Sequence, residues 1–262
     1  MLGAIIGDIV GSPYEFANTS NPRFPLFSKR SSFTDDTICT VAVADALVSG
    51  EDFGSALQRW GRKYPNPMGG YGGSFNAWLH AINPMPYNSW GNGAAMRVSP
   101  VGWAFNSEAE TLRAALASAA PTHNNVEGLI GASVVARAIY LLRTMNRPSF
   151  CCGKVYDLMV SCYGEQWDLH IPAHGVFDET CQGCVPLAFY ICSNAFSFED
   201  AIRRAVLYGG DSDTLAAIVG SLAEARWGIP DDIREKALSM LPAEMLDVIV
   251  KFEHRYKNGL KS

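Results

Sequence analysis

Two acidic segments of the chain share one pattern and offer oxygen ligands for hard metal ions. The first is TDDT at residues 34–37, and the second is DSDT at residues 211–214. Each directly precedes an apolar, alanine-rich stretch with helical spacing. Carboxylates brought together would repel one another strongly without cations. Oxygen ligands without a neighbouring His or Cys suit Mg²⁺ first, with Mn²⁺ or Ca²⁺ as alternatives.

Helix capping is the alternative interpretation of both segments, since Asp and Thr at a helix N-terminus accept hydrogen bonds from free N–H groups. A cap uses one or two side chains, whereas each segment offers three or four oxygen ligands. If the segments meet, two metal ions about 3.5–4 Å apart would polarise a substrate oxygen and orient a water. The sequence leaves open whether they meet.

Glu15 and two glycine-rich loops are further candidates. Glu15 follows an apolar helix in a Gly/Pro-containing loop and is either an acid or base over a metal site or a solvated charge. The loops GGYGGS at 69–74 and GNG at 91–93 either present successive N–H groups to a phosphate or form simple turns. Arg97 adds a fork-shaped donor suited to phosphate or carboxylate.

Aromatic, histidine and cysteine side chains each have a structural alternative. Trp90 and Tyr71 offer ring faces for a nucleobase or fill the core, and His123 is either a ligand partner or a structural histidine. Cys181 and Cys184 have the spacing of half a zinc site or of a redox pair. No second pair matches them, and free cysteines are commonly buried, so we interpret both as core residues.

Helical spacing runs through most of the chain and predicts an all-α bundle. Helices are expected over residues 37–49, 107–119, 124–143, 197–208 and 213–227, then a short one from Pro230 and an amphipathic one over 244–257. Gly50 and Gly228 suit helix C-termini, and Ser107 and Asn124 suit N-caps. The long stretches 13–33 and 64–102 are expected as loops, and loops of that length are usually functional.

Composition limits the class of protein. With 262 residues, 48% hydrophobic and 18% charged, the chain is expected to be one domain over residues 1–262. The net charge is −5, and no basic cluster favours a nucleic-acid partner. The sequence has no uninterrupted run of about 18 apolar residues, so it predicts no membrane span. The N-terminus lacks the basic start of a secretory signal. We therefore expect a cytoplasmic protein.

These segments, in chain order, resemble the ADP-ribosylglycohydrolase family, which includes dinitrogenase-reductase-activating glycohydrolase. The resemblance lies in GAIIGD at 3–8 with GSPYE at 11–15, FTDDT at 33–37, GNGAAMR at 91–97, TH at 122–123 and GGDSDT at 209–214. Together these segments are specific and cover nearly the whole chain. Ala223-Glu224-Ala225 and Leu215 depart from the pattern of many relatives, which puts substrate choice at that end of the cleft in doubt.

The resemblance implies an orthogonal multi-helix bundle with a binuclear magnesium site in a cleft. One metal would be held by Thr34, Asp35 and Asp36, and the other by Asp211, Asp213 and Thr214, with Asp213 or Asp35 bridging. Glu15 matches the family's mobile glutamate. The diphosphate and distal ribose would lie along Gly72, Gly73, Ser89, Trp90, Gly91 and Asn92, with His123 nearby.

The activity that the resemblance implies is magnesium-dependent hydrolysis of the glycosidic bond between ADP-ribose and an acceptor. Glu15, Asp35 and Asp36 are the expected catalytic residues, and Glu15 or Asp36 would guide the water or the leaving-group proton. The acceptor stays open among an arginine or serine side chain, an ester, a nucleobase and a small molecule.

Three other classes of protein are alternatives to an active hydrolase. A catalytically silent ADP-ribose-binding relative would keep the same cleft. A terpene synthase would need a third Asp where Cys39 stands, and a His-Asp phosphohydrolase would need a His-Asp dipeptide, which the chain lacks. Because all the expected ligands are present, an active hydrolase is the favoured prediction.

Overall fold

The computed structural model describes residues 1–145, 149–150 and 153–256. Its elements are α1 (Leu2–Gly11), η1 (Ser12–Tyr14), α2 (Asp35–Ser49), α3 (Phe53–Lys63), α4 (Gly73–His80), α5 (Gly93–Met96), α6 (Ser99–Ala104), α7 (Glu108–Ala119), α8 (Val126–Thr144), α9 (Lys154–Tyr163), η2 (Trp167–His170), α10 (Cys181–Asn194), α11 (Phe198–Tyr208), α12 (Ser212–Trp227), α13 (Asp231–Leu238) and α14 (Ala243–Tyr256). Within the described ranges, β-pairing is confined to two isolated bridges, so the predicted all-α class is confirmed.

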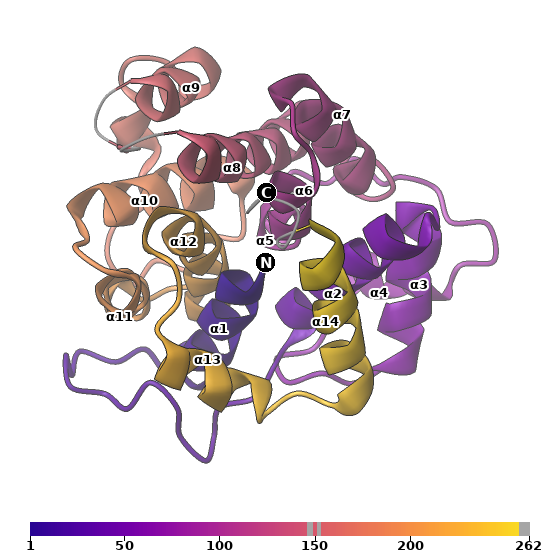
Figure 1. Ribbon diagram of the computed structural model, residues 1–262, viewed down its shortest axis with the longest axis horizontal. Helices are drawn as coiled ribbons and strands as arrows, with labels where there is room; N and C mark the ends of the chain where they lie inside the picture. The colour runs from indigo at the N-terminus through magenta and orange to yellow at the C-terminus, as the bar shows by residue number, and fades with distance from the viewer. Residues whose placement is uncertain (146–148, 151–152, 257–262) are drawn as a thin grey trace.

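The helix α1 lies beside α12 near the middle of the molecule, and α2 also packs against it (Figure 1). Every residue of α1 is buried, as expected for a helix that is apolar on all sides. Its one charged residue, Asp8, is therefore held in the interior.

Glycines on α1 allow the backbones of α1 and α12 to approach each other closely. A Cβ atom on Gly7 would lie 1.9 Å from the carbonyl oxygen of Ala216, and one on Gly11 would lie 2.5 Å from the Cα of Asp213. No other residue type fits at these two positions without moving a backbone. The contact brings the start of α12, with its acidic motif, against the end of α1.

Most expected helix ends agree with the structure. The Thr34 side chain caps α2, and Gly50 ends it in the left-handed region with φ of 81°. Ser107 caps α7 and Ser197 caps α11 through their side chains, while Gly228 ends α12.

Two expectations about local structure were wrong. The N-cap of α8 is Asn125 rather than Asn124, because the Asn125 side chain accepts from the N–H of Glu127, while Asn124 accepts from the N–H of Asn88. The stretch 64–102 is also not a continuous loop, because α4, α5 and part of α6 lie within it. Short helices of four to eight residues have too few turns for a clear periodic pattern.

The C-terminal helix packs on the chain's own core. Phe252 of α14 is fully buried, and the Tyr256 hydroxyl donates to the carbonyl of Leu47 at 2.7 Å. Its expected last residue, Lys257, lies outside the described residues. No helix in the described part of the chain is long and apolar enough to cross a membrane.

Candidate active site

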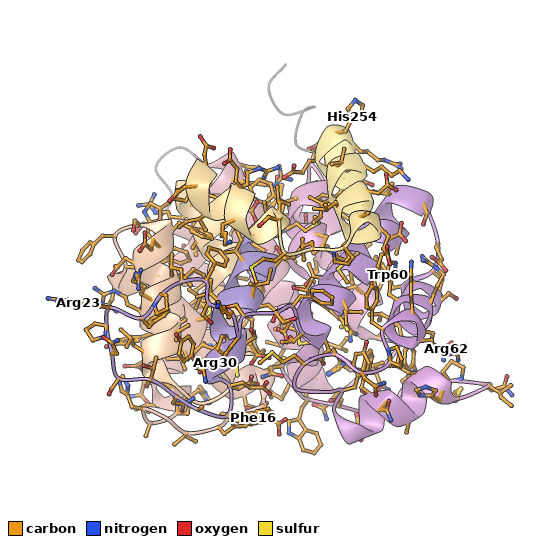
Figure 2. The ribbon with its side chains drawn as sticks, turned by 90° about the horizontal axis from the view of Figure 1, so that it is seen from below. Phe16, Arg23, Arg30, Trp60, Arg62 and His254 are labelled. Carbon is orange, nitrogen blue, oxygen red and sulfur yellow. The ribbon has the colours of Figure 1, made fainter. Side chains whose placement is uncertain are left out.

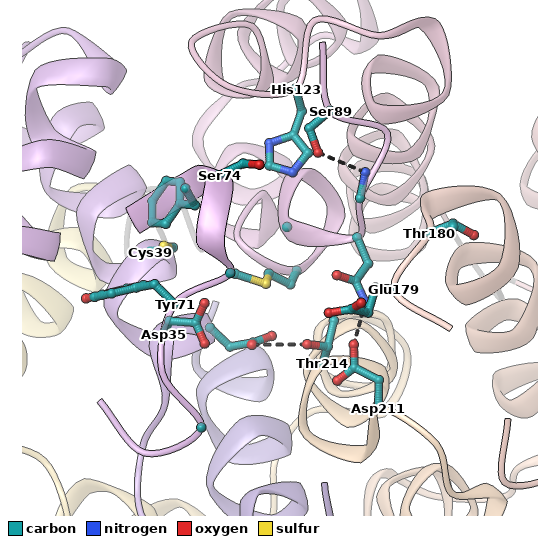
Figure 3. A pocket seen from close by; sticks show the side chains of 18 of the residues that line it. Asp35, Cys39, Tyr71, Ser74, Ser89, His123, Glu179, Thr180, Asp211 and Thr214 are labelled. Carbon is teal, nitrogen blue, oxygen red and sulfur yellow. Dashed lines mark hydrogen bonds between the residues drawn. The ribbon is translucent and has the colours of Figure 1, made fainter. Parts of the chain in front are cut away.

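The two acidic motifs meet at the N-termini of α2 and α12. Asp35 and Asp36 lie in the first turn of α2, and Asp213 lies in that of α12. The Thr214 hydroxyl donates to Asp36 Oδ2 at 3.1 Å, which links the two motifs (Figure 3). The sequence left open whether the two acidic motifs meet, and the structure shows that they do.

Glu15 lies beside the second motif. One carboxylate oxygen each from Glu15, Asp211 and Asp213 lie within 4.8 Å of one another. On its other side the Glu15 carboxylate touches Gly69, where a Cβ atom would lie 2.7 Å from Oε2. We call Glu15 together with the carboxylates of the two motifs the acidic cluster. Glu15 itself is half-buried.

Asp8 is a member of the site that the sequence reasoning missed. Its Oδ2 accepts from the backbone N–H groups of Thr34 and Thr37, each at 3.0 Å, and its Oδ1 accepts from the Thr34 hydroxyl at 2.8 Å. The Thr37 hydroxyl donates to it as well. Asp8 therefore holds the first turn of α2 in place. The signal that was available is a single charge in an otherwise apolar helix.

Burial raises the pKa values of these carboxyl groups, and repulsion from neighbouring carboxylates adds to the rise for all of them except Asp8. Burial is the largest cause for Asp8, whose pKa rises to about 6, and for Glu15, whose pKa rises to about 7 with a further contribution from Asp211. The pKa values of Asp35, Asp36 and Asp213 also lie well above the usual value, first through burial and then through their acidic neighbours. A cation would relieve this repulsion.

The donor set fits a hard cation. Among the described residues, Oδ1 of Asp36 and Oδ1 of Asp213 are buried without a hydrogen-bond partner. A buried carboxylate oxygen that lacks a partner is costly, and a metal ion removes that cost. The surrounding donors are carboxylate and hydroxyl oxygens, which suit Mg²⁺, Mn²⁺ or Ca²⁺. The acidic cluster is thus able to hold a metal ion.

A cleft of about 920 Å³ leads away from the cluster. The expected substrate-binding residues all line it: Gly72, Gly73, Ser89, Trp90, Gly91, Asn92 and His123. Figure 3 places His123 and Ser89 at one end, with Asp35, Thr214 and Asp211 at the other. Of the expected metal ligands, Thr34 alone does not line the cleft, because it is fully buried behind Asp36 with its hydroxyl donating to Asp8.

The loop around Asn92 is fixed to the acidic cluster and to α10. The Asn92 side-chain amide donates to Asp211 Oδ2 at 2.6 Å (Figure 3). The Cys181 thiol donates to the carbonyl of Gly91 at 3.1 Å, and the Cys184 thiol to that of Asp178 at 2.9 Å. Both cysteines are buried free thiols, which matches their interpretation as core residues.

The sequence predicted that the Arg97 guanidinium is available to a phosphate or carboxylate, but the structure holds this group in the interior. It is 1% exposed, and Nη2 donates to the carbonyl of Ser118 at 3.0 Å and to the Thr122 hydroxyl at 2.7 Å. The Thr122 hydroxyl in turn bonds His123 Nδ1 at 2.7 Å. Burial and the nearby guanidinium lower the pKa of His123 well below its usual value. The imidazole is therefore neutral at pH 7.

The departures noted at Leu215 and Glu224 lie away from the cleft lining. Leu215 is a buried core residue, and the Glu224 carboxylate accepts from the N–H of Gly3 at 2.9 Å. That these positions affect substrate choice stays a prediction, and the Glu224 carboxylate joins α12 to the start of α1.

The molecule combines an all-α fold with an acidic cluster that is able to hold a metal ion, at one end of a ligand-sized cleft. Comparisons with known proteins show the family to which it belongs. The family model described as ADP-ribosylglycohydrolase matches residues 1–258. The chain is 25% identical to the mouse ADP-ribosylhydrolase ARH3, over 97% of this chain and 90% of that protein. It is 24% identical to the ADP-ribosylarginine hydrolase Tri1 of Pseudomonas putida, over 98% of this chain and 75% of that protein.

A solved structure described as an ADP-ribosylglycohydrolase-related protein complex has the same fold. It superposes with a TM-score of 0.74 at 23% identity, covering 97% of this chain and 95% of that one. Given the match over nearly its whole length, the chain belongs to the ADP-ribosylglycohydrolase family, and it is a hydrolase that acts on ADP-ribosyl bonds.

Proposed function

We propose that this chain hydrolyses the glycosidic bond between ADP-ribose and an acceptor with the help of two Mg²⁺ ions bound by the two acidic motifs. The observation that carries the proposal is the junction of these motifs with Glu15 at one end of the cleft. The buried Asp36 and Asp213 oxygens without partners support a cation at this junction.

The first ion would be held by Thr34, Asp35 and Asp36, and the second by Asp211, Asp213 and Thr214. The Thr34 hydroxyl donates its proton to Asp8, so its oxygen can still act as a ligand. When bound, Mg²⁺ would neutralise the carboxylates and polarise a ribose oxygen and a nearby water.

The remaining steps fall to the chain's own carboxyl groups. Glycoside hydrolysis passes through an oxocarbenium-like transition state and needs a group that takes the water's proton and one that protonates the leaving group. With its pKa raised to about 7, Glu15 exchanges a proton readily near neutral pH. We assign it the proton of the attacking water, with Asp36 as the alternative.

The cleft would orient the rest of ADP-ribose. The free N–H groups at the start of α4, beginning with Gly73 after Gly72, suit the diphosphate. Trp90 is 49% exposed and offers a ring face to the adenine, and neutral His123 suits a ribose hydroxyl. Ser89, Gly91 and Asn92 complete this wall of the cleft.

The test is the Asp35→Ala variant, assayed for release of ADP-ribose beside the wild type. We expect a loss of at least about a thousandfold in kcat, because an ion and its orientation of the ribose are both lost. Circular dichroism checks that the variant is folded. A folded variant that still hydrolyses would overturn the mechanism. Tight ADP-ribose binding by an inactive wild type would favour a silent binding protein instead.

A further inference from the structure

Two buried side chains behind the cleft wall form a chain of hydrogen bonds that ends on His123. Arg97 Nη2 donates to the Thr122 hydroxyl at 2.7 Å, and that hydroxyl bonds His123 Nδ1 at 2.7 Å. Arg97 is 1% exposed and Thr122 is fully buried, so neither bond is open to solvent. Arg23, by contrast, reaches out from the edge of the molecule, as most arginines do (Figure 2). We call Arg97 and Thr122 the imidazole anchor.

The direction of the first hydrogen bond decides the direction of the second. A guanidinium carries only donors, so the Thr122 oxygen accepts from Arg97. The hydroxyl has one hydrogen of its own, and among the described residues His123 Nδ1 is the single acceptor that it reaches. If Nδ1 carried the imidazole proton instead, the buried hydroxyl hydrogen would lack an acceptor, which is costly. The contacts therefore favour a bare Nδ1 and a protonated Nε2.

The Nε2 edge of the imidazole is the edge that a ligand in the cleft can reach. His123 lines the cleft, and no described residue forms a hydrogen bond with its Nε2 atom (Figure 3). A Cβ atom on Gly93 would lie 3.0 Å from Nε2, and one on Gly91 would lie 3.6 Å from it. Because both of these positions are glycine, no side chain covers Nε2.

The charge of the anchor acts in the same direction as its hydrogen bonds. Burial, and then the positive charge of Arg97, lower the pKa of His123, which disfavours a second proton on the ring. A neutral ring has one N–H group and one bare nitrogen. With the bare nitrogen turned to Thr122, the ring offers the cleft a donor and no acceptor.

We propose that Arg97 and Thr122 are positioning residues that hold His123 as the neutral Nε2–H tautomer, so that it donates to an oxygen atom of ADP-ribose and takes no proton from the reaction. This inference rests on the proposed function for its ligand. A ligand atom that carries a hydrogen in place of that oxygen would set two donors against each other and would be rejected. Because His123 has no free lone pair facing the cleft, general-base catalysis is left to the carboxyl groups.

The direct test is nitrogen NMR at pH 7 on the wild-type protein labelled with ¹⁵N-histidine. The chain has five histidines, and the signals that disappear in His123→Asn assign His123. We expect a protonated Nε2 and a bare Nδ1. A protonated Nδ1 with a bare Nε2, or a ring with protons on both nitrogens, would overturn the proposal. This measurement needs no turnover, so its failure is distinct from failure of the proposed hydrolysis.

The role of the anchor is tested by Thr122→Val, which removes the hydroxyl and keeps the shape of the side chain, and by Thr122→Ser, which keeps the hydroxyl. Thr111→Val is the matched control, because Thr111 is also fully buried and its hydroxyl donates to the carbonyl of Ser107 at 2.9 Å. Calorimetry with free ADP-ribose gives the affinity of each variant. Steady-state kinetics on the substrate that the wild type cleaves separates KM from kcat.

We expect Thr122→Val to bind ADP-ribose about tenfold more weakly, because the ring loses the bond that orients it. Its KM should rise while kcat changes little, Thr122→Ser should recover most of the affinity, and Thr111→Val should bind like the wild type. Unchanged affinity in Thr122→Val, or an equal loss in Thr122→Ser, would overturn the role of the hydroxyl. A wild type that binds ADP-ribose without hydrolysing it would overturn the proposed function alone, and one that does not bind it would overturn both.

Discussion

Glu15 takes its position from contacts on both sides of the acidic cluster. Its backbone segment is tied to Gly210 through Asn18, and its carboxylate rests against Gly69, which adopts φ of 79°. The placement of Glu15, whose pKa is raised to about 7, therefore depends on a neighbouring loop. This dependence can be tested without changing Glu15 itself.

In a Gly69→Ala variant, we expect kcat to fall at least about tenfold, because the new methyl group would displace the Glu15 carboxylate. Gly70→Ala is the matched control: its φ is 83°, so the backbone strain is equal, and nothing lies within 4 Å of the added Cβ. Steady-state kinetics on both variants is the measurement. Equal losses would show that backbone strain, and not contact with Glu15, is responsible.

Asp8 holds the first turn of α2 in place because its carboxylate accepts four hydrogen bonds from Thr34 and Thr37. In Asp8→Asn the amide replaces one acceptor oxygen with a donor, so at least one buried N–H or hydroxyl loses its partner. We expect the free energy of unfolding to fall by about 1–3 kcal/mol and Mg²⁺ binding to weaken. Urea unfolding and calorimetry measure the two effects. An unchanged Mg²⁺ affinity would show that Asp8 does not position the first motif.

At the scale of helices, the contact between α1 and α12 brings the two acidic motifs together. Gly7→Ala would place a methyl group 1.9 Å from the carbonyl oxygen of Ala216, where only backbone can move. We expect a loss of about 3 kcal/mol or more in stability, at the upper end of the cost of overpacking. Gly54→Ala in α3 is the control, since its nearest contact is an ordinary 3.4 Å. Thermal unfolding compares them, and similar melting temperatures would contradict the account.

Helix ends were predictable where one residue decides them, as the side chains of Ser107 and Ser197 do at N-termini and the left-handed backbone of Gly50 does at a C-terminus. The N-cap of α8 was misplaced by one residue because two adjacent asparagines satisfy the same pattern, and a tertiary bond to Asn88 claims the first. The helices between residues 64 and 102 were missed because each is short and depends on tertiary contacts for its stability.

At the scale of the whole molecule, the acidic cluster makes stability depend on pH and on metal. The raised pKa values mean that the folded chain binds protons more tightly than the unfolded one, so stabilisation present below about pH 4 is lost as pH rises through about 6 to 7. We expect the metal-free melting temperature to fall across this window, and Mg²⁺ to raise it more at pH 8 than at pH 5.

Differential scanning fluorimetry with EDTA and with Mg²⁺ measures this dependence. The Asp213→Asn variant is the control, because removing one charge should reduce both the pH dependence and the Mg²⁺ effect. A Mg²⁺-induced shift of equal size at both pH values, or in the variant, would contradict a metal bound by this cluster.

Most of the residues that the sequence singled out line one cleft. They could be recognised because the acidic motif, which occurs twice, and the two glycine-rich loops are local sequence patterns. What the sequence did not reveal are partners brought in from elsewhere in the chain: Asp8, buried in α1, and Phe177 and Glu179 before α10. Such contacts depend on how helices pack and leave no periodic signal. That residues 1–262 form a single domain stays a prediction.

The most direct test of the central claim is release of free ADP-ribose from arginine-, serine- and ester-linked substrates, measured with Mg²⁺ and with EDTA. We predict release from at least one linkage with Mg²⁺, no release with EDTA, and recovery when Mg²⁺ is added back. Release that persists undiminished in EDTA, or no release from any linkage, would contradict metal-dependent ADP-ribosyl hydrolysis by this chain.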